Sequence, residues 1–339
     1  MLAAFTLPCR AEDPPKKEVR DAVSRAVGWL RQAQSRGGAF GSQPGETALA
    51  LMALRHSGVP ASDPACLRAA KRLEHDLPDG QCYSAALGTL ALLAQNPERH
   101  RKKIRKLVDS IVRGQCRNGQ WSYKLRRTGR RKEGDNSNTQ IAVLALYAAR
   151  MRGVAVPDEP FTLLRSHLES VQNPDGGFGY TALSERSYAS MTAGCAMALA
   201  LCLAVEKRKP SVDPVVRSNA GVQRAYTWLA REFRPGINRG AGRARSNKRK
   251  KRNDTHWRHY WLWSLERACG VTRTTRLGEH DWYAAGARYL LESQRAGGEW
   301  RDPESALQAT CFGLLFLSRR TTITITPRDR DRATTPPTK

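Results

Sequence analysis

A short glycine-rich turn recurs along this chain and constrains its fold more than any other feature. Five copies, each pairing glycine with an aromatic residue, occupy residues 37–41, 79–83, 118–121, 175–179 and 297–300, and a degenerate copy lies at 239–242. Gly38, Gly80 and Gly119 are 42 and 39 residues apart, and Gly177 follows 58 residues later. Such a period is typical of a repeat protein with one supersecondary unit per repeat.

Two kinds of helical pattern alternate around these turns. Before the turns, apolar residues recur at helical spacing beside a polar face, which predicts amphipathic helices over residues 23–34, 67–77, 104–115, 161–172, 222–233 and 283–294. After the turns come segments that are apolar nearly all round, which predicts buried helices. Four of these align on a threonine followed seven residues later by leucine: Thr47 and Leu54, Thr139 and Leu146, Thr192 and Leu199, Thr310 and Leu317. The other two cover residues 85–93 and 257–268.

The alternation predicts an all-α fold, an (α/α)6 toroid in which about six helix–loop–helix repeats form a double ring. An open solenoid has the same alternation, but the number of repeats and the lack of a polar terminal cap favour closure. The period-2 pattern of strands is missing. We expect the toroid over residues 19–320 with a basic insertion at 239–252, a leader over 1–18 and a disordered tail over 321–339.

The chain is strongly basic, with 57 lysines and arginines, 31 acids and a net charge of +26. This charge predicts attraction to anionic surfaces. The longest basic run gives a candidate polyanion site at Arg243, Arg245, Lys248, Arg249, Lys250, Lys251 and Arg252. A second basic cluster lies at residues 126–132. Aromatic residues do not interleave with these runs, which argues against sequence-specific nucleic-acid binding.

The N-terminal residues bear on localisation. Residues 1–11, a short apolar run ending in small residues, are similar to the end of a secretory signal without its charged start. A truncated signal predicts an exported protein; an ordinary terminus predicts a cytoplasmic one. Two of the eight cysteines, Cys82 and Cys116, follow similar glycine–glutamine steps and could pair in an oxidising compartment.

The turns resemble the glutamine–tryptophan motifs of the squalene cyclase and protein prenyltransferase β-subunit superfamily. The matching glutamines are Gln34, Gln115, Gln172 and Gln294, and the matching aromatic residues are Phe40, Trp121, Phe178 and Trp300. We expect the glutamine to bond backbone at a helix end and the aromatic ring to join adjacent helices. The resemblance covers roughly residues 19–320 and implies the double ring of helices.

The same resemblance bears on chemistry. Residues 135–139 resemble the Asp-x-Asp-Asp-Thr segment of class II terpene cyclases, whose middle acid protonates an alkene or epoxide. Here Asp135 matches the first acid, Ser137 replaces the proton donor and Asn138 replaces the last acid. Residues 137–139 could instead cap a helix. In the last repeat, Ala309 takes the place of the zinc-binding histidine of the prenyltransferases.

Three functional hypotheses follow. The first is a toroid that lacks the proton donor and zinc site and binds an isoprenoid, another apolar lipid or a protein partner. The second is an active cyclase or transferase that uses other residues, with Asp135, Glu46, Tyr188, Glu185 and His256 as candidates. The third is a scaffold that binds polyanions or membrane surfaces through the basic runs. Whether the chain is an enzyme, and its oligomeric state, stay open.

Two smaller groups complete the candidates. Trp257, Tyr260 and Trp261 form an aromatic run that could face the centre of the ring, where aromatic faces attract cations. His256, His259 and His280 are weak candidates for metal binding beside acids at 279 and 281. The preferred interpretation is that no metal or other cofactor binds.

Overall fold

Helices make up nearly all of the described structure. The computed structural model describes residues 14–76, 80–125, 134–184, 186–209, 213–241 and 255–319. Within these ranges the chain forms no strand, only two isolated bridges. Six amphipathic helices are α1 (Lys16–Ala33), α3 (Pro64–Asp76), α5 (Arg101–Arg113), α7 (Glu159–Val171), α10 (Ala220–Glu232) and α12 (Trp282–Ser293). Six apolar helices alternate with them: α2 (Pro44–His56), α4 (Cys82–Gln95), α6 (Asn136–Met151), α8 (Ala189–Glu206), α11 (Arg258–Thr272) and α13 (Ala306–Ser318).

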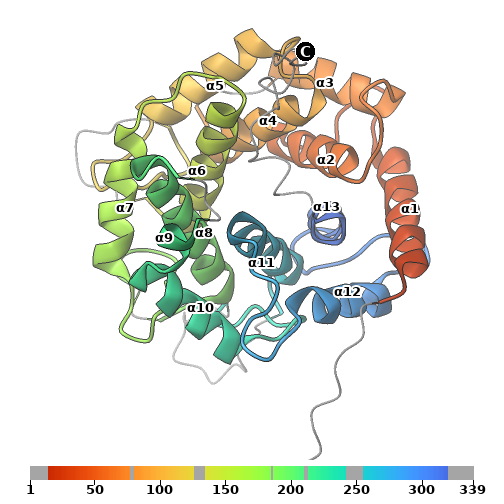
Figure 1. Ribbon diagram of the computed structural model, residues 1–339. Helices are drawn as coiled ribbons and strands as arrows, with labels where there is room; N and C mark the ends of the chain where they lie inside the picture. The colour runs from red at the N-terminus through yellow and green to blue at the C-terminus, as the bar shows by residue number, and fades with distance from the viewer. Residues whose placement is uncertain are drawn as a thin grey trace, which may run out of the picture.

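The helices form two concentric rings (Figure 1). The inner helices contact one another in the order α2, α4, α6, α8, α11 and α13, and α13 contacts α2 again. The outer helices surround them, and α12 contacts α1, so both ends of the repeat array meet. The prediction of a closed toroid, rather than an open solenoid, is confirmed. The short helix α9 (Pro214–Arg217) is an addition that the repeat pattern does not predict.

Burial follows the two sequence patterns. In α5 the buried residues Ile104, Leu107, Val108 and Ile111 lie on one face, while basic residues occupy the other. In α8 every residue from Ala189 to Val205 is buried. This helix is long and apolar enough to cross a membrane, but 94% of it is buried inside the ring. It is therefore a core helix that two layers of neighbours enclose.

Glycine is required at the turns because the next outer helix approaches so closely. Gly38, Gly119, Gly176 and Gly298 all have a positive φ, between 85° and 96°. A Cβ atom on any of them would lie 2.5–2.7 Å from a backbone carbonyl oxygen of the adjacent outer helix. Both the left-handed backbone and this contact exclude a side chain.

The glutamines at these turns connect neighbouring repeats. Each glutamine amide donates through Nε2 to the carbonyl of the turn glycine four residues later, at 2.8–3.1 Å. The four donors are Gln34, Gln115, Gln172 and Gln294. Each also donates to a carbonyl of the next outer helix, at 2.8–2.9 Å. The second acceptors are Ala65, Pro160, Gly221 and Ala22. The bond from Gln294 to Ala22 joins the last repeat to the first.

The aligned threonines fix the aromatic residue of each turn. The backbone N–H groups of Phe40, Trp121, Phe178 and Trp300 donate to the hydroxyls of the four threonines, at 2.9–3.1 Å. All four aromatic side chains are fully buried. Turn, inner helix and next outer helix are therefore joined in one unit, and the structural role expected for the motif is confirmed.

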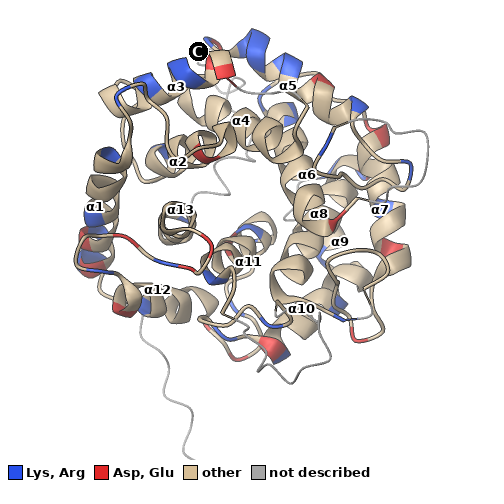
Figure 2. Ribbon diagram, turned by 180° about the vertical axis from the view of Figure 1, so that it is seen from behind, with Lys and Arg blue, Asp and Glu red and all other residues tan. Residues whose placement is uncertain are grey.

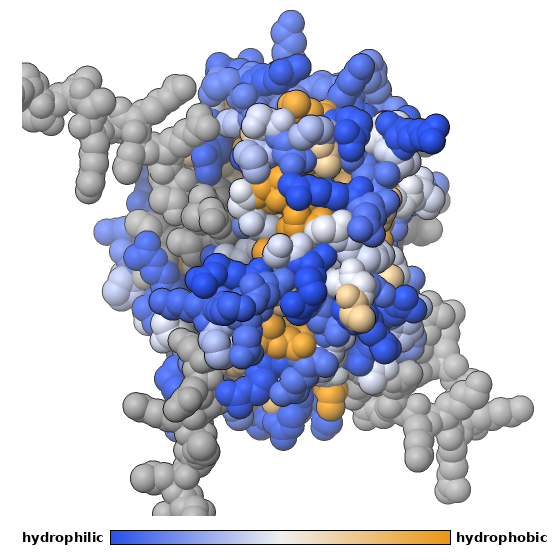
Figure 3. Space-filling model, turned by 90° about the vertical axis from the view of Figure 1, so that its right-hand side faces the viewer, coloured by the Kyte–Doolittle hydropathy of each residue, from blue (hydrophilic) through white to orange (hydrophobic). Residues whose placement is uncertain are grey.

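The outer surface is mainly polar and basic. In Figure 2, lysine and arginine gather on outer helices, including α3 and α5, while the inner helices carry few charges. The face around α1 is hydrophilic with small apolar patches (Figure 3). Cys82 and Cys116 are free thiols, so the structure shows no disulfide between them. The expected leader, the tail and the polyanion site at residues 243–252 lie largely or wholly outside the described residues.

Replacing Gln294 by leucine should weaken ring closure, because the carbonyls of Gly298 and Ala22 lose their shared donor. We expect the free energy of unfolding to fall by about 1–3 kcal/mol in urea titrations. The matched control is Gln223→Leu, on the exposed face of α10 with one bond to the Arg217 carbonyl, and it should change stability by less than about 0.5 kcal/mol. Equal effects of the two substitutions would contradict the closure role.

Candidate functional site

A cavity of about 470 Å³ lies where the six inner helices begin, at the centre of the ring. Figure 2 views the face that carries the loops leading into these helices. All six inner helices or their preceding turns contribute to the lining. Its residues are Gln43, Gly45, Glu46, Leu49, Gln81, Tyr83, Ser84, Leu87, Tyr123, Ser137, Tyr180, Tyr188, Met191, Trp257, Tyr260, Trp263, Gln308 and Phe312.

Apolar and aromatic side chains dominate the lining. The Phe312 ring stacks on Trp263 with centroids 5.0 Å apart and meets Tyr260 edge-on at 5.3 Å. Aliphatic side chains from α2, α4 and α8 add Leu49, Leu87 and Met191. Cavities of this size and composition are typical of sites for small, mainly apolar ligands.

The aromatic run predicted for the lumen is only partly confirmed. Trp257 and Tyr260 line the cavity, but Trp261 does not. Its indole N–H instead donates to the carbonyl of Arg234, 3.1 Å away, outside the inner ring. Successive residues of a helix point about 100° apart, so Trp263, close to one turn after Tyr260, takes the position that was expected for Trp261.

The segment that resembles the cyclase acid motif begins helix α6. Asp135 is the N-cap: its carboxylate accepts from the backbone N–H and the side-chain amide of Asn138, both at 2.8 Å. The capping residue is thus Asp135, not residues 137–139. Burial raises the pKa of Asp135 above its ordinary value, although the bonds from Asn138 oppose this effect. Asp135 does not line the cavity, whereas Ser137 does.

Ser137 occupies a network of hydroxyl groups. Its hydroxyl is hydrogen bonded to Tyr83 and, at 3.1 Å, to Tyr260. The amide of Gln140 donates to the Tyr260 hydroxyl at 2.8 Å. The network therefore links three lining residues to the interior of α6.

Glu46 is the one acid in the described lining. One carboxylate oxygen accepts from the backbone N–H groups of Ser42 and Gln43, at 2.9 and 3.1 Å, in a capping box at the start of α2. The other accepts from the amide of Gln308 at 3.2 Å. Tyr188 precedes α8 and also lines the cavity. Glu185 lies outside the described residues.

A buried cation lies behind the aromatic wall. Arg267 is fully buried, and its guanidinium carbon is 3.6 Å from the centroid of the Trp263 ring. Its Nη2 donates to Gln140 Oε1 at 2.8 Å and to Ser264 at 3.0 Å. Its Nη1 has no hydrogen-bond partner in the described structure. Burial lowers the pKa of Arg267 from its ordinary value, but an arginine stays protonated in proteins.

The three histidines do not converge. His256 is paired with Glu304, and His259 lies 3.0 Å from Asp302. His280 packs against the ring of Phe233. Among the described residues no cluster of three histidines, cysteines or acids could hold a metal ion. The three histidines therefore do not come together in one place in this part of the chain.

Asp302 and Glu304 serve a structural purpose at α11. Trp257, the N-cap residue of α11, has a left-handed backbone conformation and provides no side-chain cap. The first N–H groups of the helix donate instead to Glu304 and Asp302, at 3.3 and 3.1 Å. Burial alone would raise the pKa of Asp302, but bonds and charge from His259 and Arg258 outweigh it, so the pKa lies below its ordinary value. The next repeat thereby positions the helix that carries Tyr260, Trp263 and Arg267.

Helix α13 carries Cys311 and also Ala309, the residue that was compared with the zinc-binding histidine of the prenyltransferases. Ala309 is buried and, like Cys311, does not line the cavity. Burial raises the pKa of the Cys311 thiol, which disfavours the thiolate that metal binding needs. Among the described residues, Cys311 belongs to no group of three or more histidines, cysteines or acids that could hold a metal ion.

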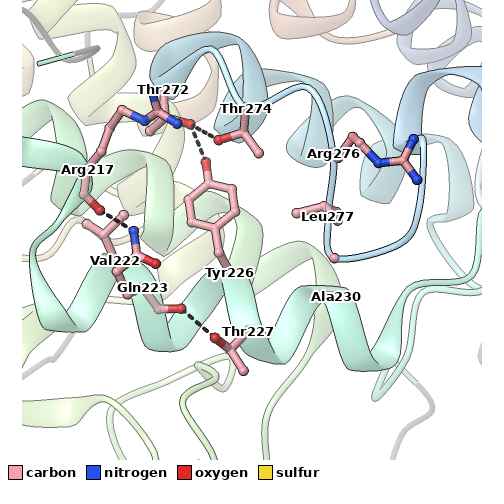
Figure 4. Close-up of a pocket in the computed structure, with 11 residues that line it drawn as sticks. Arg217, Val222, Gln223, Tyr226, Thr227, Ala230, Thr272, Thr274, Arg276 and Leu277 are labelled. Carbon is pink, nitrogen blue, oxygen red and sulfur yellow. Dashed lines mark hydrogen bonds between the residues drawn. The ribbon is translucent and has the colours of Figure 1, made fainter. Parts of the chain in front are cut away.

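A second pocket of about 400 Å³ lies between α10 and the turn after α11 (Figure 4). Tyr226 crosses it, with its hydroxyl donating to the Ala268 carbonyl and hydrogen bonded to Thr272, at 2.7 and 2.8 Å. Arg217 and Arg276 lie at its borders. Its open shape and internally bonded polar groups mark a surface groove, which shares no lining residue with the central cavity.

Several lining residues were missed by the sequence reasoning. The main ones are Tyr83, Tyr123, Tyr180, Gln308 and Phe312. A usable signal exists: many lining residues lie in the turn before an inner helix or in its first two turns. Arg267 had the further signal of a charge inside an otherwise buried helix.

Comparisons with known proteins agree with this architecture. Residues 11–324 match the prenyltransferase alpha-alpha toroid domain. The type II terpene cyclase MstE from Scytonema has a similar structure, with a TM-score of 0.52 and 13% identity over 90% of this chain and 99% of that one. The α-1,6-mannanase GH76A of Salegentibacter sp. HEL1_6 gives a TM-score of 0.62 at 10% identity, with the same coverage.

Lin0763 of Listeria innocua is similar too, with a TM-score of 0.61 and 10% identity over 90% of this chain and 97% of that one. No curated protein matches. At these identities the solved structures show a shared fold and nothing of a shared reaction. The family match spans most of the chain, so this protein belongs to the prenyltransferase α/α toroid family.

Proposed function

We propose that the protein binds an isoprenoid or similar apolar lipid in its central cavity and does not carry out the proton-initiated or zinc-dependent reactions of its relatives. The observation that carries this proposal is the lining: aromatic and aliphatic side chains surround about 470 Å³, and Glu46, the single acid among the described lining residues, accepts hydrogen bonds at both oxygens. Apolar surface recognises an apolar ligand chiefly by removing it from water.

The polar groups argue against proton-initiated cyclisation. The position of the proton donor belongs to Ser137, and a hydroxyl is too weak an acid to protonate an alkene. Asp135 turns its carboxylate to the start of α6, and its oxygens accept bonds from Asn138. A general acid must reach the reacting atom, and neither Asp135 nor the engaged Glu46 is arranged to do so.

The buried arginine also argues against a carbocation intermediate. Trp263 has one face on Phe312 and a guanidinium 3.6 Å from its centroid. The π-electrons of the Trp263 ring could stabilise a cation in the cavity. They already interact with the guanidinium of Arg267. A second positive charge nearby would be repelled through a low-dielectric interior.

Related toroids bind both terpenoids and sugars. One variant of MstE is solved with merosterolic acid A, its product, and the mannanase with α-1,6-mannotriose. An oligosaccharide carries hydroxyls around its rings and needs polar partners on most sides. Here Leu49, Leu87, Met191 and Phe312 present apolar surface beside the glutamines and tyrosine hydroxyls of the lining, and this apolar share favours a lipid.

A larger side chain that fills the cavity should weaken lipid binding. We expect farnesol to quench tryptophan fluorescence saturably, because Trp257 and Trp263 line the site. Met191→Trp should weaken binding at least tenfold by occupying the space. The matched control is Leu163→Trp on α7, 38% exposed on the outer ring, which should bind like the wild type. α-1,6-Mannotriose should not displace farnesol from either the wild type or the control variant.

Saturable farnesol binding that Met191→Trp leaves intact would place the ligand elsewhere and contradict the proposal. Binding of mannotriose in place of farnesol would contradict the ligand class. Circular dichroism of both variants shows whether the helical fold is retained, so lost binding is distinguished from unfolding.

A second candidate function, docking to an anionic membrane surface, has its own observation. Three of the five exposed large hydrophobic residues in the described structure lie in loops on the face where the cavity opens: Tyr123, Leu183 and Ile237, which are 58%, 80% and 40% exposed. Exposed basic residues lie close to each of them in sequence: Lys124, Arg186 and Arg239. Apolar side chains flanked by cations favour the interface of anionic lipid bilayers.

Vesicle sedimentation tests this second function. The triple variant Tyr123→Ser, Leu183→Ser, Ile237→Ser should bind phosphatidylserine vesicles several-fold more weakly than the wild type. The control is Leu67→Ser, Leu163→Ser, which removes the two exposed apolar residues of α3 and α7. Equal loss in both variants, or wild-type binding to neutral vesicles alone, would reject this face as the docking surface.

A further inference from the structure

The hydrogen bonds between Arg267 and the cavity run in one direction. Arginine donates and cannot accept, so the bond of 2.8 Å from Arg267 Nη2 fixes the oxygen of the Gln140 amide on the arginine side. The amide nitrogen of Gln140 must then face Tyr260, and it donates to that hydroxyl at 2.8 Å. The buried cation therefore decides which way the amide of Gln140 is turned.

This direction continues through the hydroxyl groups. Because Tyr260 accepts from Gln140, its own proton is free to be donated to Ser137, 3.1 Å away. Ser137 can in turn donate to its other partner, Tyr83. One proton remains after these bonds, and it is that of the Tyr83 hydroxyl. Tyr83 lines the cavity.

The remaining proton is well suited to bind a ligand oxygen. Chains of hydrogen bonds polarise one another in a low-dielectric interior, and this one starts at a buried guanidinium with an unsatisfied Nη1. Tyr260 also lies within hydrogen-bonding reach of Tyr83. A ligand oxygen in the cavity therefore competes for the Tyr83 proton only with the neutral Tyr260 hydroxyl, which already accepts from Gln140.

We propose that Tyr83 is a specificity-determining residue that donates a hydrogen bond to an oxygen of the ligand, so that the site selects apolar chains carrying an acceptor oxygen over plain hydrocarbons. This inference rests on the proposed function, since it names the class of lipid that the cavity takes. The chemistry covers ethers, carbonyls and alcohols, which all present an oxygen lone pair.

A second tyrosine supplies a natural control. Tyr226 is a tyrosine outside the cavity whose hydroxyl donates to the Ala268 carbonyl at 2.7 Å and is hydrogen bonded to Thr272 at 2.8 Å. Tyr226 does not line the cavity, so the loss of its hydroxyl should leave the ligand site unchanged.

Three farnesyl probes separate the hydrogen bond from apolar burial: farnesene has no oxygen, farnesyl methyl ether only accepts, and farnesol accepts and donates. The wild type should bind the ether and the alcohol about tenfold more tightly than farnesene. Tyr83→Phe should remove that preference and leave farnesene binding within about twofold. Tyr226→Phe, which removes a hydroxyl in the groove between α10 and α11, should keep the preference for the ether.

Gln140→Glu tests the direction of the chain. A carboxylate at this position only accepts, so Tyr260 would donate to it, Ser137 to Tyr260 and Tyr83 to Ser137. Tyr83 would then offer a lone pair in place of a proton. We expect this variant to lose affinity for the methyl ether and to keep it for farnesol, which can donate.

Each outcome is decisive. Equal binding of all three probes by the wild type would overturn this inference and leave the proposed function standing. A uniform loss for all probes in Tyr83→Phe would show a purely structural role and would also overturn it. Binding of none of the probes by the folded wild type would refute the proposed function and this inference together.

Discussion

Four glutamine amides, each donating to two backbone carbonyls, are the interaction on which the ring depends. Each amide bridges the end of one outer helix and the start of the next. The bond from Gln294 to Ala22 does this between residues 272 positions apart in sequence. These bridges hold the turn glycines against the backbone of the neighbouring outer helix. The outer ring thereby keeps the inner helices arranged around the central cavity.

Local patterns predicted the fold because the toroid repeats a local unit. Glycine at a positive φ, a glutamine four residues before it and a threonine on the following helix are all visible in the sequence, and each has the partner that the pattern indicates. Closure was harder to predict, since it depends on the summed angles of all repeats. The short helix α9 lies in a repeat junction where no periodic signal operates.

The site was less predictable because it depends on directions of side chains across the ring. The sequence indicates that residues 257–263 are rich in aromatic side chains. Choosing between Trp261 and Trp263 needs the rotation of α11 about its axis, and the N–H groups at the start of this helix donate to Asp302 and Glu304 of the next repeat. Likewise, Gln140 and Arg267 are 127 positions apart, and their bond cannot be read from either segment alone.

The polarity of the cavity follows from these long-range contacts. Arg267 lies behind the aromatic wall, and hydrogen bonds through the Gln140 amide and the Tyr260 hydroxyl connect it to Ser137 in the cavity lining. The chain has the fold of its family, and the neutral oxygen-bearing lipid that we propose as its ligand fits this arrangement of charges.

A crystal structure of the protein with farnesol tests this account most directly. The account predicts density for the farnesyl chain among Leu49, Met191 and Phe312, with the alcohol oxygen about 3 Å from the Tyr83 hydroxyl. Farnesol bound in the groove between α10 and α11, or in the central cavity with its oxygen turned away from Tyr83, would contradict it.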